Sequence, residues 1–101
     1  MANIYEGPSS ANVPSMAGVG TVSEIIVPMN NDRVGLMITN ISSQTVYLAL
    51  GGHPATLRAG IVLTADGGAF SLDSFSYTKD AVSAIAHAST LVVAFQEMVR
   101  S

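Results

Sequence analysis

The stretch RVGLMITNISSQTVYLAL, residues 33–50, carries the clearest structural signal in the chain. Alternate side chains of an extended segment point to opposite faces, so apolar residues at every second position indicate a strand with one buried face. In 33–41, Val34, Leu36 and Ile38 lie on one face of the expected strand. In 45–50, Val46, Leu48 and Leu50 do the same. Because the polar break between them is short, the pattern predicts two antiparallel strands joined as a hairpin.

Five more segments rich in β-branched or aromatic residues lie between turn residues, at 21–28, 57–64, 69–77, 81–88 and 91–99. The alanine-rich segment 81–88 has helical propensity, but its short length and flanking turns favour a strand, paired with 91–99 in a second hairpin. A parity switch in 69–77 predicts a bend or bulge near Asp73 and Ser74. About seven strands at intervals of about ten residues predict an all-β fold, an antiparallel β-sandwich that is jelly-roll-like.

The alternation also predicts which side chains form the core of this sandwich. The expected buried residues are Leu36, Ile38, Val46, Leu48, Ile61, Leu63, Phe70, Ile85, Val93 and Phe95. Truncating any of them to alanine is expected to destabilise the fold by roughly 2–5 kcal/mol.

The first twenty residues differ from the rest, because they are rich in glycine, proline and serine and follow neither apolar period. We therefore expect an extended N-terminal arm at 1–20 and a β-sandwich domain at 21–101. Pro8 and Pro14 narrow the unfolded ensemble and so reduce the entropy lost when such an arm becomes ordered. We expect the arm to cross onto a neighbouring subunit or partner, with Ile4, Tyr5 and Val13 as apolar contacts.

The composition limits the kinds of partner. Of the 101 residues, 49% are hydrophobic and only 11% are charged, against about 25% in typical domains. The net charge of −3 and the scattered Lys and Arg residues argue against nucleic acid as a partner, and no apolar run is long enough for a membrane span. Because the domain is small and has so few charged residues to cover its surface, we expect it to form a homo-oligomer, a trimer or alternatively a dimer.

No constellation of residues indicates catalysis, and we expect no enzyme activity, cofactor or metal. The chain has no cysteine, and His53 and His87 are its only histidines, so a zinc site would have to be assembled from distant loops. Asp66 is best explained by turn chemistry, since no segment gathers the oxygen ligands that calcium needs. Asn40-Ile41-Ser42 fits the glycosylation sequon, a weak motif. Among the aromatic residues, Tyr47 and Tyr77 are the candidates for an interface, where tyrosine is enriched.

Several short motifs resemble the small decoration, or cement, proteins of tailed-bacteriophage capsids. They are Arg33-x-x-Leu36-x-Ile38-x-Asn40-Ile41-Ser42-Ser43, Val46-Tyr47-Leu48, Gly60-Ile61-x-Leu63, Gly67-Gly68, Ala81-Val82-x-Ala84-Ile85-Ala86, Thr90-Leu91-Val92-Val93 and Glu97. The resemblance spans about residues 33–97 and carries no active-site residue. It implies a jelly-roll-like β-sandwich, assembled as dimers or trimers on the symmetry axes of a shell.

The expected function is accordingly a virion structural protein that binds the outside of the capsid and stabilises it by bridging neighbouring major capsid subunits. Its expected location is the virion surface, after assembly in the cytoplasm of the bacterial host. Two alternatives stay open: a fibre- or tail-associated module that recognises a host glycan or protein, and a β adaptor with another partner.

Overall fold

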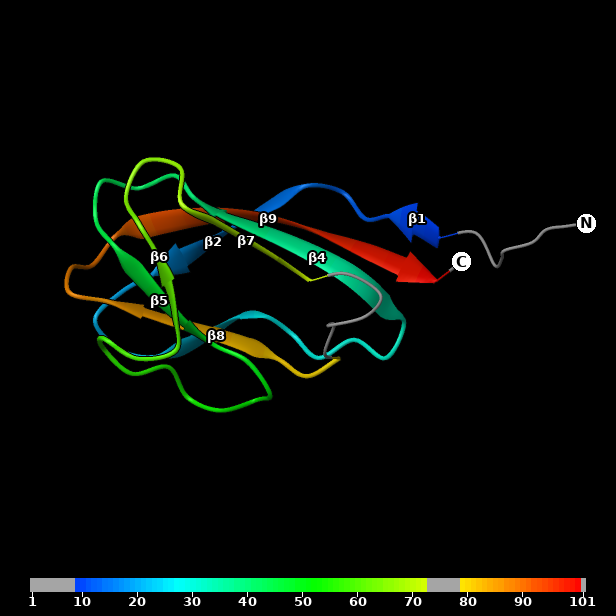
Figure 1. Ribbon diagram of the computed structural model, residues 1–101, viewed down its shortest axis with the longest axis horizontal. Helices are drawn as coiled ribbons and strands as arrows, with labels where there is room; N and C mark the ends of the chain where they lie inside the picture. The colour runs from blue at the N-terminus through cyan, green and yellow to red at the C-terminus, as the bar shows by residue number, and fades with distance from the viewer. Residues whose placement is uncertain (1–8, 73–78, 101) are drawn as a thin grey trace, which may run out of the picture.

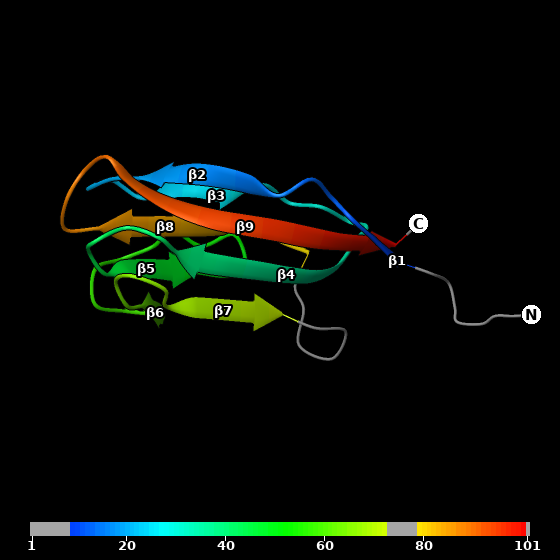
Figure 2. The same ribbon diagram turned by 90° about the horizontal axis from the view of Figure 1, so that it is seen from above.

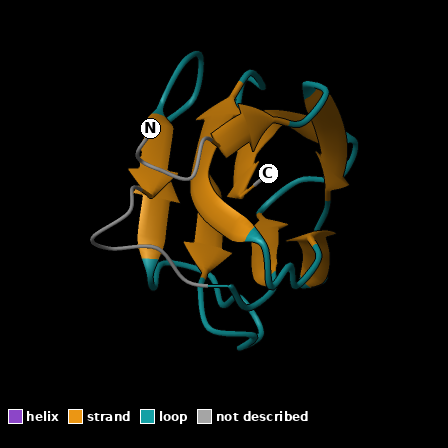
Figure 3. Ribbon diagram, turned by 90° about the vertical axis from the view of Figure 1, so that its right-hand side faces the viewer, coloured by secondary structure: helices purple, strands orange, loops and turns teal. Residues whose placement is uncertain are grey.

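The computed structural model describes residues 9–72 and 79–100, in which all regular structure is β (Figure 1). The strands are β1 (Ser9–Ala11), β2 (Ser15–Val19), β3 (Glu24–Val27), β4 (Arg33–Asn40), β5 (Val46–Ala49), β6 (Ile61–Leu63), β7 (Ala69–Leu72), β8 (Val82–Ala86) and β9 (Leu91–Arg100). Figure 3 shows loops and turns between these strands wherever the connection is described. Among the described residues, no helix is long and apolar enough to cross a membrane.

The strands form two antiparallel sheets that pack face to face. The five-stranded sheet has the order β2-β9-β4-β7, with β1 also paired to β9, and the four-stranded sheet has the order β3-β8-β5-β6. Figure 2 shows strands of one sheet lying over strands of the other, β2 over β3 and β9 over β8. This paired order is that of a jelly roll. The all-β sandwich expected from the sequence is confirmed.

Both predicted hairpins are wrong. β4 lies in the five-stranded sheet and pairs with β7 and β9, whereas β5 lies in the other sheet and pairs with β6 and β8. β8 and β9 are likewise in different sheets. In a jelly roll most consecutive strands pass from one sheet to the other, so a short connection can be an arch between layers instead of a hairpin turn.

The side chain of Asn40 explains the arch between β4 and β5. It is fully buried, and its Nδ2 donates to the carbonyl oxygens of Gln44 (2.7 Å), Leu63 (3.0 Å) and Thr64 (3.1 Å). Its Oδ1 accepts the Ser42 N–H at 2.9 Å. The amide thereby satisfies several backbone groups where the chain leaves one sheet for the other. Because Asn40 is buried, its sequon is inaccessible in the folded chain.

Most of the predicted core is confirmed. The predicted residues that are buried in the core are Leu36, Ile38, Val46, Leu48, Leu63 and Val93. Ile85 is also buried, but on the outer side of the four-stranded sheet. Ile61, Phe70 and Phe95 are only half-buried and pack against the core. For Ile61 and Phe70 the reason is position, because β6 and β7 are edge strands. Val34 is also half-buried. A bulge between Arg33 and Gly35 shifts the alternation by one residue, so the Arg33 side chain points inward instead of that of Val34.

The buried residue Arg33 ties β4 to β9 and to two loops. Its Nε lies 2.7 Å from Glu97 Oε2, and its guanidinium also donates to the carbonyl oxygens of Asp80 (2.9 Å) and Pro28 (2.7 Å). The Arg33 side chain is 0% exposed and that of Glu97 12%. A charge so deeply buried is tolerated only when it is paired and hydrogen-bonded, as it is here.

The segment expected to leave the domain as an arm is partly integrated into it. β1 and β2 both pair with β9 of the same chain, from Ser9 opposite Arg100 to Val19 opposite Leu91. The edge of β9 offers unpaired backbone groups along its whole length, which a segment without its own apolar period can still occupy. Residues 1–8 lie outside the described residues, as does the bend expected near Asp73 and Ser74.

Candidate interaction surface

The outward side of the five-stranded sheet is the most distinctive surface of the domain, and we call it the open face. It is defined by the outward-facing residues in the middle of the sheet, all of them exposed or half-buried: Met16, Gly18, Met37, Thr39, Ala69, Ser71, Val92, Ala94 and Gln96. The same parity continues beyond the open face to Met98 and to the exposed Arg100 at the end of β9. The strand registers place them in rows across the sheet, with Met16 beside Ala94, Ala94 beside Thr39, and Thr39 beside Ala69.

The open face carries no charged residue. Met16 is 71% exposed and Met37 52%, and between them lie small or uncharged side chains. The core of a protein–protein interface is depleted of charge and enriched in methionine and aromatic residues. Flexible methionine side chains also adapt to irregular partner surfaces. The open face shares with such interface cores the absence of charge and the exposed methionines.

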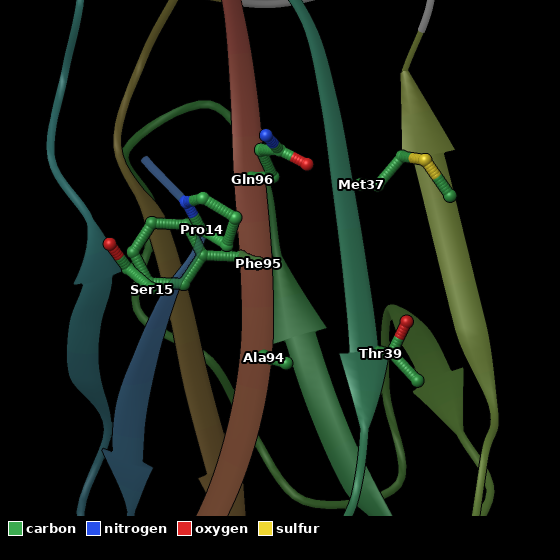
Figure 4. A pocket seen from close by; sticks show the side chains of 7 residues that line it. All are labelled: Pro14, Ser15, Met37, Thr39, Ala94, Phe95 and Gln96. Atoms are coloured by element: carbon green, nitrogen blue, oxygen red, sulfur yellow. The ribbon is translucent and has the colours of Figure 1, made fainter. Parts of the chain in front are cut away.

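A shallow groove of about 220 Å³ lies on this face where β2 begins, lined by Pro14, Ser15, Met37, Thr39, Ala94, Phe95 and Gln96. Figure 4 shows Pro14 and Phe95 on one side of β9 and Met37 and Thr39 of β4 on the other. Pro14 lies between β1 and β2, where its missing N–H suits an interruption of the ladder. The groove is smaller than the roughly 300–1,000 Å³ of ordinary ligand pockets. Its size suits a protein side chain better than a cofactor.

The outward side of the four-stranded sheet is different, because the chain itself covers its centre. The loop between β5 and β6 crosses this side (Figure 1). The loop is fixed by the Gly52 N–H, which donates to the Ala81 carbonyl (3.1 Å), and by the Ala55 N–H, which donates to Ser23 Oγ (2.8 Å). Beneath it, Ser83 and Ile85 are buried although they point away from the sandwich core. The two outer surfaces of the sandwich are therefore not equivalent.

The structure separates the interface residues predicted from the sequence. Ile4, Tyr5 and Tyr77 lie outside the described residues. Val13 is 82% exposed at the break between β1 and β2, beside the groove. Tyr47 lies on the opposite sheet, half-buried, with its ring edge-on to that of His87 at a centroid distance of 5.8 Å.

The residues of the open face itself were missed as a site. The outward parity of Met37 and Thr39 was readable from the alternation in 33–41. Their neighbours Met16 and Ala94 become visible only once the strand order is known, because they come from β2 and β9. As to metals, no three His, Cys, Asp or Glu side chains in 9–72 and 79–100 come together as a possible binding group.

Comparisons with known proteins support the architecture alone. No protein-family model matches the chain, and no curated protein matches it. A similar solved structure comes from work on Bacillus endospore appendages, described as a family of disulfide-linked pili. The two superpose with a TM-score of 0.53 over 99% of this chain and 96% of that chain, at 15% sequence identity. At this identity the likeness shows a shared fold.

Proposed function

We propose that this chain is a capsid decoration protein, which binds the outside of a bacteriophage shell through the open face and stabilises the shell by bridging major capsid subunits. The observation that carries the proposal is the asymmetry of the sandwich. The open face is uncharged and uncovered, whereas the outer side of the other sheet is covered at its centre by the chain's own loop. The resemblance of residues 33–97 to decoration proteins suggests the major capsid protein as the partner.

The size of the open face suits a protein that acts in many copies. Four strands about 4.8 Å apart, with about five residues each at about 3.3 Å, give a face of roughly 300 Å². A stable pairwise interface buries about 800 Å² on each partner. One open face alone therefore binds weakly, and firm attachment needs further contacts or several linked copies. A homotrimer on the shell, or alternatively a dimer, provides such linkage.

The fold is compatible with a role in assembly outside viruses as well. The similar structure belongs to pili that are described as disulfide-linked. This chain has no cysteine, so any assembly that it forms must be held together without disulfides. That requirement places more weight on apolar contacts such as those the open face offers.

The experiment uses empty heads of the virus whose genome encodes the chain, mixed with wild-type protein or with one of three single variants. Met37→Lys and Ala94→Lys place a charge on the open face, and Val62→Lys places one at a position of matched exposure (53%) on the other sheet. Copies bound per head are measured by quantitative mass spectrometry after sedimentation.

We expect the open-face variants to lose at least about tenfold in affinity, equivalent to about 1.4 kcal/mol. Val62→Lys is expected to bind like the wild type, in a fixed ratio to the major capsid protein. Equal binding by all variants would reject the open face as the contact. A few copies per particle, together with binding to host cells, would instead identify the fibre- or tail-associated module.

A further inference from the structure

The N-terminal strand segment, residues 9–19, is attached to its own domain in an unusual way. Of the side chains in 11–19, Val19 is buried and Ala17 half-buried, while all the others are exposed. The segment therefore contributes little to the core, and its attachment comes mainly from backbone pairing along β9. Regions with few buried apolar contacts open at low free energy compared with the whole domain.

The contacts that do hold the segment are not specific to one copy. Near the break, the Asn12 N–H donates to the Glu97 carbonyl (2.8 Å), and Gln96 Nε2 donates to the Asn12 carbonyl (3.0 Å). Every one of these bonds forms equally well with β9 of a second chain. Residues 9–19 carry no charge, so the two charged residues of β9, Glu97 and Arg100, meet no like charge on the segment of an incoming copy.

The connection that follows β2 is short and lies at the surface. It runs from Gly20 to Ser23 before β3 begins, with Val22 69% exposed. Gly20 is held by a bond from the Ala86 N–H to its carbonyl (2.9 Å), and a Cβ built on Gly20 would meet nothing within 4 Å. This short surface connection is the hinge at which the segment would leave the domain.

When the segment leaves, β9 becomes an open edge strand of ten residues. Such an edge attracts another strand, because its unpaired N–H and C=O groups need partners. The segment that fits with the same register and the same side-chain contacts is residues 9–19 of another copy. Domain swapping of an identical element is a low-cost route to a closed oligomer.

We propose that the chain assembles by exchanging residues 9–19, so that β1 and β2 of one copy pair with β9 of the next in a closed assembly of two or three chains. The exchanged form competes with a tethered segment, whose effective concentration is about millimolar. Exchange is therefore expected at high local concentration, as on a crowded surface. The proposal concerns contacts between copies and stands whether or not the partner is a capsid.

The test is an isotope-filtered nuclear Overhauser experiment on the isolated chain. Labelled and unlabelled protein are mixed after unfolding, refolded together near millimolar concentration, and the mass is checked by light scattering. We expect a dimer or trimer in which the Met16 and Ala94 methyl groups, neighbours across β2 and β9, give a cross-peak between labelled and unlabelled chains. Contacts between Ile38 and Phe95, neighbours across β4 and β9, serve as the control and stay within one chain.

Three results would overturn the proposal. One is a monomer at this concentration, and another is an oligomer whose Met16–Ala94 cross-peaks all arise within one chain. The third is a cross-peak between chains that joins Met16 to Met37 while Met16–Ala94 contacts stay internal. That pattern would identify packing of two open faces without exchange.

Discussion

The ion pair of Arg33 and Glu97 gives the sharpest test of how residues far apart in the sequence stabilise the fold. These residues are 64 positions apart in the sequence and 2.7 Å apart in the structure. We expect Glu97→Met to destabilise the chain by about 3–5 kcal/mol, because it removes the Glu97 carboxylate from a guanidinium that is fully buried. For a domain with a total stability of about 5–15 kcal/mol, this is a large fraction.

The effect of Arg33→Met depends on what stands at position 97. In the wild type we expect a similar cost of about 3–5 kcal/mol, because Glu97 and the carbonyls of Pro28 and Asp80 lose their donor. In Glu97→Met, the same substitution removes a buried charge that has already lost the Glu97 carboxylate. This gain offsets the loss of the two carbonyl bonds, and the change should fall within about 1 kcal/mol of zero.

The assay is equilibrium unfolding in urea, followed by far-ultraviolet circular dichroism, because the chain has no tryptophan. Free energies come from linear extrapolation, and an unchanged slope shows that each variant exposes the same surface on unfolding. Arg58→Met is the matched control, since Arg58 is exposed and its loss should change stability by at most about 0.5 kcal/mol. An equal cost of Arg33→Met in both backgrounds would refute the coupling.

Three further substitutions, one of them with Gly52→Ala as its control, test the loop between β5 and β6, the arch between β4 and β5, and the core by the same unfolding assay. Gly60→Ala should destabilise the chain far more than Gly52→Ala. Both glycines have positive φ, but only a Cβ on Gly60 would collide with the Leu48 carbonyl oxygen. Similar losses of stability in the two variants would contradict this. Asn40→Ala should cost more than about 3 kcal/mol, because several carbonyls lose their donor, and a cost below 1 kcal/mol would speak against the arch. Leu36→Ala should cost about 2–5 kcal/mol, and no loss would contradict its burial.

The sequence predicts well which side chains of a strand are buried, because apolar residues in these strands recur at every second position. Leu36, Ile38, Val46 and Leu48 alternate with outward residues, and burial follows that alternation. Alternation fixes which face of a strand is buried but does not name its partner. The hairpins were wrong for this reason, since nothing in 33–50 distinguishes a turn within a sheet from an arch between sheets.

The candidate surface was harder to predict than the core for the same physical reason. Met16 and Met37 share one face only because β9 lies between β2 and β4, and that order is set by long-range pairing. Arg33 also could not be recognised as buried from its neighbours. A bulge before Gly35 turns its side chain inward, and its partner Glu97 lies near the other end of the chain.

A reconstruction of decorated heads by electron cryomicroscopy tests the central claim most directly. The account predicts density for the β-sandwich on the outer surface of the shell, across boundaries between major capsid subunits, with Met37 and Ala94 facing the shell. The account would be contradicted by heads that carry no such density, or by a sandwich attached through the loop between β5 and β6 with its open face toward solvent.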